Sequence, residues 1–305
     1  MRNVRGRSIR VGSMSEAPAV ETGDAPVDPY RTSLYSAAEL YDAPSYPDSL
    51  DARVYAWSRR PPSPHDSLVQ ALHDHALDEA LTGWLSGRHL VGVMGDHGLP
   101  RGGTPYADAA RLGALLGRSY VVATGGGPGA MEAANLGGRL AHAPAAALTD
   151  ALERLAGVPS VDPSVDAWVA AARSVASIDP RPDESPTLGI PTWFYGHEPP
   201  NVFATAIAKY FRNATREAIL LQICDAGIVF LPGAAGTVQE IFQDACENYY
   251  AVNGSVATMV LVGRSYWTTD FPAWPLLRSL ARGRLMEPHV HLVDTVDEAA
   301  ELMCS

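Results

Sequence analysis

The chain has 305 residues, enough for one large α/β domain or two ordinary ones, and 47% of them are hydrophobic. Its 23 basic and 34 acidic residues give a formal net charge of −11, which argues against binding to the polyanionic backbone of a nucleic acid. Three cysteines without C-x-x-C spacing argue against a disulfide framework or a cysteine zinc site, and no apolar run has membrane-spanning length. These features indicate a cytoplasmic protein.

The N-terminal part differs in composition from the rest. Residues 1 to about 30 are rich in Pro, Gly, Ser and Glu and are expected to be disordered. Tyr and Leu residues scattered over 30–60 predict a short arm lying on the main domain, and PPSP at 61–64 predicts a connector. The expected division is therefore a tail and arm, 1–60, followed by one domain, 61–305.

Helical and strand-like segments alternate from residue 66 onward. Leucines and a tryptophan at mostly helical spacing predict a helix over 66–86. Short apolar runs predict buried strands at 90–95, 120–124, 187–194, 226–232, 256–263 and 290–293. Helices are expected between and after them, over 107–117, 125–138, 202–223, 233–250, a segment before 290, and 296–302.

This alternation predicts an α/β fold, a Rossmann-like doubly wound parallel sheet with helices on both faces. Residues 141–186 interrupt the pattern with a stretch rich in Ala, Pro and Asp. Two parts of it, LTDALERLAG and VDAWVAAARSV, have helical spacing. We therefore expect a helical insertion or lid there.

A glycine-rich sequence, TGGGPGAME at 124–132, follows the second predicted strand. Glycines let the backbone turn sharply and approach an anion, and the following helix, with Pro128 near its first position, offers unpaired N–H groups. The spacing also fits the G-x-G-x-x-A dinucleotide fingerprint, but no strand with a ribose-binding acidic residue follows directly. A tight turn with close helix–sheet packing is the alternative. The candidate anion-binding residues are Gly125, Gly126, Gly127, Gly129 and Ala130.

A second strand–turn–helix sequence, LPGAAGTVQE at 231–240, has the same character. Both loops would lie at the carboxyl ends of strands in one parallel sheet, where such folds bind ligands. Thr237 and Glu240 have the spacing of a capping box, so Glu240 serves either the helix alone or a catalytic role. The candidate ligand-binding residues are Gly233, Ala234, Ala235, Gly236 and Thr237.

Three basic residues of the predicted 202–223 helix, Lys209, Arg212 and Arg216, would form one stripe at i, i+3 and i+7. Such a stripe is commonly a solvated face, but this helix leads into the strand before the second glycine loop. His97, after the first strand, is a minor candidate for the same rim. No metal site is predicted.

The paired glycine motifs resemble the Lonely Guy (LOG) family of nucleoside 5′-monophosphate phosphoribohydrolases, which carry GGG-x-x-G and PGG-x-GT-x-x-E. The resemblance runs from VGVMG at 91–95 to about residue 263, and EPPN at 198–201 is similar to larger bacterial nucleotide 5′-monophosphate nucleosidases of the same superfamily. It implies cleavage of the N-glycosidic bond of a nucleoside monophosphate to free base and ribose 5-phosphate, without a cofactor or metal ion. By position it implies catalytic roles for Arg216 and Glu240, with Arg212 as a substitute, and a homodimer.

Three departures from the family pattern bear on activity. Ala234 replaces a glycine and would cost about 1 kcal/mol if the site needs a positive φ. Gln239 replaces a common acidic residue, and the spacing from Arg216 to the second loop is one residue longer than usual. Two alternatives follow: a non-catalytic nucleotide or cofactor carrier, as molybdenum-cofactor carrier proteins are similar in fold and loops, and an NAD-dependent oxidoreductase. Contacts to the base are expected from 96–106 and 141–186.

Overall fold

The computed structural model describes residues 23–177, 184–195, 198–252 and 256–304. Most of the tail that is expected to be disordered, 1–22, lies outside the described residues. Within the described part, no helix is long and apolar enough to cross a membrane.

Seven parallel strands form one sheet in the order β4-β3-β2-β1-β5-β6-β7, which confirms the predicted doubly wound α/β fold. β3 is shorter than the predicted 187–194 strand because the chain meets Pro191, which has no N–H for the ladder. The strands are β1 (Leu90–Met94), β2 (Val121–Thr124), β3 (Thr187–Gly189), β4 (Ala206–Ile207), β5 (Gly227–Phe230), β6 (Met259–Val262) and β7 (Val290–Val293).

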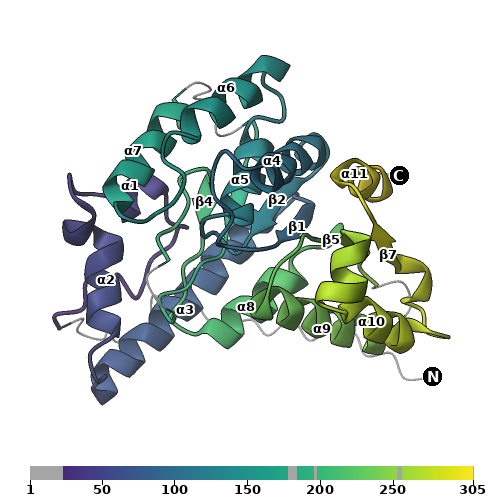
Figure 1. Cartoon of the computed structure of the whole chain (residues 1–305). Helices are drawn as coiled ribbons and strands as arrows, with labels where there is room; N and C mark the ends of the chain where they lie inside the picture. Colours follow the sequence, from purple (N-terminus) through teal and green to yellow (C-terminus); the bar gives the residue numbers. More distant parts are fainter. Residues whose placement is uncertain (1–22, 178–183, 196–197, 253–255, 305) are drawn as a thin grey trace.

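Helices cover both faces of this sheet (Figure 1). One face packs against α4 (Thr104–Leu116), α5 (Ala130–Arg139) and α11 (Val296–Cys304). The other packs against α3 (Pro64–Leu85), α8 (Asn213–Gln222), α9 (Ala235–Tyr250) and α10 (Ala273–Ala281). Because β1 leads to α4 on one face and the adjacent β5 leads to α9 on the other, a crevice opens between the ends of these two strands, the place where such folds bind ligands.

The predicted helix over 202–223 is wrong. The chain forms β4 and an irregular segment first, and α8 begins only at Asn213. Buried Asp74 of α3 accepts hydrogen bonds from the N–H groups of Phe211 and Arg212, both at 3.0 Å, and so holds the backbone that a continuous helix would have used. The basic stripe therefore does not form, and Lys209 is buried, its Nζ 2.6 Å from Oδ1 of Asp51.

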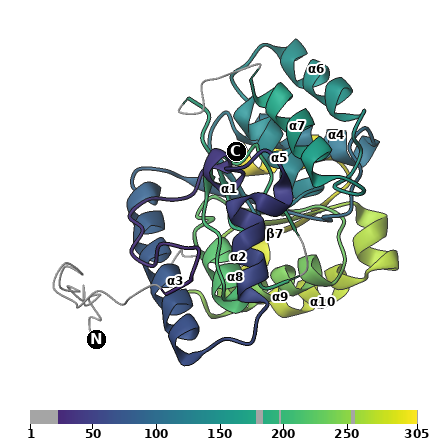
Figure 2. The ribbon, with the colours of Figure 1, turned by 90° about the vertical axis from the view of Figure 1, so that its left-hand side faces the viewer.

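The N-terminal arm is part of the hydrophobic core. It contains α1 (Ala37–Leu40), a short 3-10 turn and α2 (Leu50–Ser58), and Figure 2 shows these helices on the outer side of the molecule. Val54 and Trp57 are buried against the sheet's helices, and so is Val27, within the segment expected to be disordered. Burial of these side chains fixes the arm in place.

The insertion forms the two predicted helices, α6 (Ala145–Leu155) and α7 (Val165–Ala176). Their buried residues pack with Tyr41 and Tyr46 of the arm and with Leu140, which follows α5. The arm and the insertion therefore share one hydrophobic cluster beside the sheet.

Candidate functional site

A cavity of about 420 Å³ opens at the carboxyl ends of β1 and β2, beside α8 and α9. Residues far apart in the sequence meet there because parallel strands end at one edge of the sheet. The structure brings to it the following sequence-predicted residues: His97, Gly125, Arg216, Ala234, Ala235, Gly236, Thr237 and Glu240.

The second glycine loop opens directly into this cavity. α9 has its N-cap at Ala234, so Ala235, Gly236 and Thr237 carry the first three N–H groups of the helix, which have no intrahelical partner. These groups, at the positive end of the helix dipole, can bind an anion. Ala234 has φ −95°, so an alanine at this position carries no cost of a positive φ.

The predicted capping box of Thr237 and Glu240 is wrong. The helix begins earlier than the capping box requires, which puts Thr237 at its third residue and Glu240 in its second turn. The backbone N–H groups of the second turn are bonded within the helix, so the Glu240 carboxyl group has no end of the helix to cap. Its side chain lines the cavity instead.

The protein environment shifts the ionisation of Glu240. Burial raises its pKa to about 7, Arg216 opposes that rise, and the nearby carboxylate of Glu217 adds to it. The side chain remains partly exposed on the cavity side. Near neutral pH Glu240 can therefore both accept and release a proton.

Arg216 of α8 lies across from the first glycine loop. Its side chain is 11% exposed, and its Nε has no hydrogen-bond partner in the described part of the chain. The position that a Cβ of Gly125 would occupy is 3.5 Å from its Nη1. The adjacent Glu217 is 3.9 Å away and already accepts hydrogen bonds from Asn213 and Gln239, so the guanidinium has donors available for an anion.

Arg212, the expected substitute for Arg216, lies outside the cavity. It is the N-cap residue of α8, exposed, and its backbone N–H is bonded to Asp74. The longer spacing between Arg216 and the second loop therefore still places the Arg216 side chain in the cavity.

The first glycine loop is mostly closed off from the cavity. Asn201 donates from its backbone N–H to Gly126 at 2.8 Å and from Nδ2 to Gly127 at 3.1 Å. The N–H of Ala130 donates to the carbonyl oxygen of Asp96 at 2.9 Å, and Gly129 is buried with φ +69°. Of the predicted binding residues of this loop, Gly125 lines the cavity, whereas Gly126, Gly127, Gly129 and Ala130 are buried and do not line it.

Two other features of this loop differ from the sequence-based expectation. α5 begins at Ala130, so Pro128 precedes the helix instead of occupying its first turn. The loop also follows β2, whereas the dinucleotide fingerprint belongs to the turn after the first strand. This placement weakens the oxidoreductase alternative.

Several cavity residues escaped the sequence analysis: Asp96, Met131, Thr192, Tyr195, Glu198 and Glu217. Two of them could have been found from the sequence: Asp96 directly follows the first strand, and Glu198 belongs to the EPPN segment. Tyr195 lies in an irregular segment without such a signal. The residue is 44% exposed, and its hydroxyl accepts a hydrogen bond from Nδ2 of Asn213 at 3.0 Å. Its aromatic ring offers a surface on which a flat ring can stack.

The cavity combines groups of opposite character. The start of α9 and Arg216 attract an anion, whereas the carboxylates of Asp96, Glu198 and Glu240 can accept hydrogen bonds from hydroxyl groups. Of the expected sources of base contacts, 96–106 contributes Asp96 and His97, whereas the described residues of 141–186 contribute none. Among the described residues, no three His, Cys, Asp or Glu side chains are grouped so as to hold a metal ion.

Neither a protein-family model nor a curated protein matches the sequence. Solved structures that are similar to this chain include the molybdenum cofactor binding protein from the phototrophic bacterium Rippkaea orientalis, with 16% identity over 72% of this chain and 97% of that chain and a TM-score of 0.43. TM1055 has 19% identity over 70% and 98%, with a TM-score of 0.44. The molybdenum cofactor carrier protein MCP from Chlamydomonas reinhardtii has 17% identity over 71% and 96%, with a TM-score of 0.42.

Proposed function

We propose that this chain is a nucleoside 5′-monophosphate phosphoribohydrolase, which hydrolyses the N-glycosidic bond to give a free base and ribose 5-phosphate. One observation carries the proposal. Glu240, whose pKa is raised to about 7, shares a cavity with Arg216 and with the free N–H groups at the start of α9.

The 5′-phosphate would bind at the start of α9. A Cβ at Gly236 would have no atom within 4 Å, so there is open space beside the backbone N–H groups. Arg216, with its unpartnered Nε, supplies the balancing charge. Because the phosphate lies far from the bond that breaks, its binding energy serves to position the ribose.

The hydrolysis itself requires a carboxylate near the ribose. When the bond between C1′ and the base nitrogen breaks, the bonding electrons leave with the base, which takes up a proton, and positive charge develops on the sugar ring. Water adds to C1′ and gives up a proton. Glu240 as the carboxylate would stabilise the ring charge and accept that proton, and Tyr195 would stack on the base.

A non-catalytic nucleotide or cofactor carrier is the second candidate. The observation that favours it is the methyl group of Ala234, which is exposed at the rim of the cavity where the resembled enzymes have a glycine. This methyl group limits the approach of a substrate to the backbone while leaving the anion-binding N–H groups accessible. The two candidates differ in turnover, not in binding.

A chromatographic assay of the purified protein with AMP, GMP, IMP, CMP, UMP and an N6-modified AMP tests the proposal. We expect release of base and ribose 5-phosphate from at least one of them. Glu240→Gln keeps the shape of the side chain and should lower the rate by at least ~100-fold. Glu247→Gln, the same change at an exposed position of α9 outside the cavity, should leave it unchanged.

Two results would contradict the proposal. Equal rates for the wild-type protein and Glu240→Gln would remove Glu240 from the chemistry. Binding of nucleotides without release of base across the whole panel would favour the carrier. The homodimer and the cytoplasmic location expected from the sequence remain predictions.

A further inference from the structure

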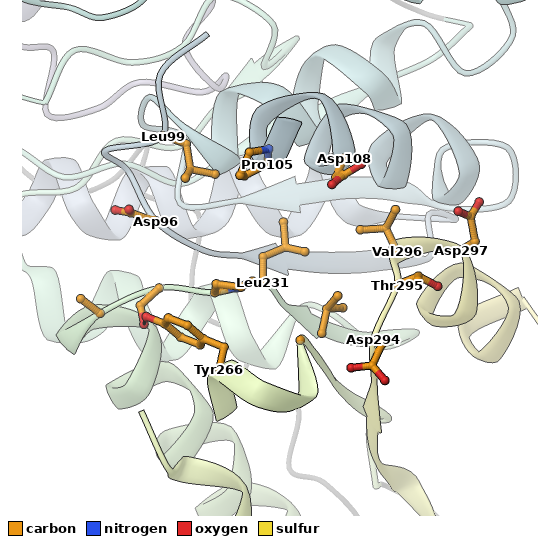
Figure 3. Close-up of a pocket in the computed structure, with 15 residues that line it drawn as sticks. Asp96, Leu99, Pro105, Asp108, Leu231, Tyr266, Asp294, Thr295, Val296 and Asp297 are labelled. Atoms are coloured by element: carbon orange, nitrogen blue, oxygen red, sulfur yellow. Dashed lines mark hydrogen bonds between the residues drawn. The ribbon is translucent and has the colours of Figure 1, made fainter. Parts of the chain in front are cut away.

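A second cavity, of about 480 Å³, lies on the other side of the second glycine loop (Figure 3). It is enclosed by the start of α4, the start of α11 and a π-helical turn, η3 (Tyr266–Asp270). Asp96 and Ala234 line both cavities and separate them. The hydrolysis proposed above makes no use of this second space.

The floor and the upper wall of the second cavity are apolar. Figure 3 shows Leu99 and Pro105 on the side of α4, facing Leu231 at the end of β5. Val262 and Val296 extend the apolar surface, and the ring of Tyr266 closes one end. Tyr266 is held in place because its hydroxyl donates to the carbonyl oxygen of Gly233 at 2.9 Å. A concave apolar surface with a few polar groups is typical of a small-molecule site.

The charged groups of this cavity all have one sign. Four of the 15 lining residues are aspartates, and none is Lys, Arg or His. Asp294 and Asp297 are paired with Arg264 and Arg111, at 3.3 and 2.7 Å, outside the lining. Among the described residues, the carboxylate of Asp96 accepts one hydrogen bond, from the N–H of Gly98 at 2.9 Å, and has the ring of His97 at 3.9 Å.

Asp108 is the aspartate of this cavity whose negative charge has no paired cation among the described residues. It is exposed on α4, and none of the described residues forms a hydrogen bond or an ion pair with it. Figure 3 shows its carboxylate beside Val296, at the edge of the apolar surface. A charged group of a ligand that lies on this surface would therefore meet an unpaired negative charge.

Two helices begin at this cavity: α4, whose start has no side-chain cap, and α11, whose start is capped by its own side chains. At the start of α11, Oε2 of Glu298 accepts the N–H groups of Asp294 and Thr295, at 2.9 and 3.2 Å. The N–H of Glu298 in turn donates to Oγ1 of Thr295. These N–H groups are therefore occupied, unlike those at the start of α9.

We propose that the second cavity binds a small organic cation, an apolar ring that carries a protonated amine. The ring would lie on the apolar floor formed by Leu231 and Val296, and the ammonium group would lie beside the carboxylate of Asp108. The carboxylates that line the cavity disfavour the binding of an anion, because like charges repel one another. This inference does not depend on the hydrolytic activity.

Tryptamine and indole-3-propionate form a matched pair of probes, because they share a ring system and carry opposite charges. In calorimetric titration of the full chain, tryptamine should bind at least about tenfold more tightly than indole-3-propionate. Asp108→Lys should reverse this preference. Glu153→Lys, the same charge change on an exposed position of α6 outside the cavity, should leave it unchanged.

A third variant locates the binding. Leu99→Trp fills the apolar part of the second cavity and should weaken tryptamine binding by about tenfold or more. A melting temperature equal to that of the wild-type protein would show that the variant is folded. The proposal is overturned if tryptamine shows no binding at millimolar concentration, or if it binds no more tightly than indole-3-propionate. It is equally overturned if Asp108→Lys or Leu99→Trp leaves its affinity unchanged.

Discussion

The first and the second glycine loop have similar sequences, yet they lie in different surroundings. The first is buried: Asn201 donates to the carbonyl oxygens of Gly126 and Gly127, and the N–H groups of Gly126 and Ala130 donate to Thr124 and Asp96. The second ends at an open cavity, where no described residue bonds the first three N–H groups of α9. The two loops therefore differ in whether another segment of the chain covers them.

The acidic residues of the two following helices show the same contrast. Glu132 of α5 accepts from Nε of Arg101 at 3.0 Å and from the hydroxyl of Tyr106 at 2.9 Å, so its charge is fully paired. Glu240 of α9 forms no hydrogen bond with any residue that the structure describes, and burial raises its pKa to about 7. The paired acid stabilises the fold, whereas the unpaired acid is available for chemistry.

Replacing one glycine in each loop by alanine should have the largest effect. Gly129 has φ +69°, and a Cβ there would lie 2.5 Å from the carbonyl oxygen of Asp96, so we expect Gly129→Ala to lower the free energy of unfolding by about 3 kcal/mol. A Cβ at Gly236 would have no atom within 4 Å, so Gly236→Ala should raise the free energy of unfolding by ~0.5–1 kcal/mol through the higher helix propensity of alanine. Urea unfolding measures both, and effects of the same sign would erase the distinction between the loops.

A smaller effect concerns another unpaired acid of α9. Asp244 is 3% exposed, and none of the described residues bonds its Oδ2. Burial and, to a smaller extent, the nearby carboxylate of Glu247 together raise its pKa from 3.8 to about 8. Between these two pKa values the folded state holds a proton that the unfolded state has released, so stability falls as the pH rises from about 4 to 8. Asp244→Asn removes this loss.

We expect Asp244→Asn to raise the free energy of unfolding by ~1–3 kcal/mol at pH 9 and by less at pH 5. Asp108→Asn, the same change at an exposed and unpaired position, should leave the pH dependence of stability as it is in the wild-type protein. Unfolding curves at the two pH values measure the difference. An equal change at pH 5 and pH 9 would mean that Asp244 is ionised in the folded protein.

The sequence allowed the sheet to be predicted, because apolar runs bounded by glycine or charged residues mark buried parallel strands. The helix over 202–223 was wrong because Asp74, more than a hundred residues away, bonds the backbone at Phe211. Likewise, nothing in TGGGPGAME shows that Asn201 covers the first loop. Local patterns predict local structure, whereas contacts between distant segments decide which loop stays open.

The second cavity could not be predicted from the sequence for the same reason. Its walls come from residues at the ends of α4, β5, η3 and α11. In the sequence, the apolar residues of these segments have the pattern of ordinary core residues of a helix or a strand. Asp96 was within reach, because it follows the first strand at the edge where parallel sheets bind ligands.

We propose above that the second loop, with Arg216, binds the phosphate end of a nucleotide. Calorimetric titration with ribose 5-phosphate tests it most directly, without the need for turnover. We predict that the wild-type protein and Arg212→Ala bind with similar affinity, because Arg212 lies outside the cavity, and that Arg216→Ala binds at least about tenfold more weakly. Equal affinity of Arg216→Ala and the wild-type protein would contradict the account.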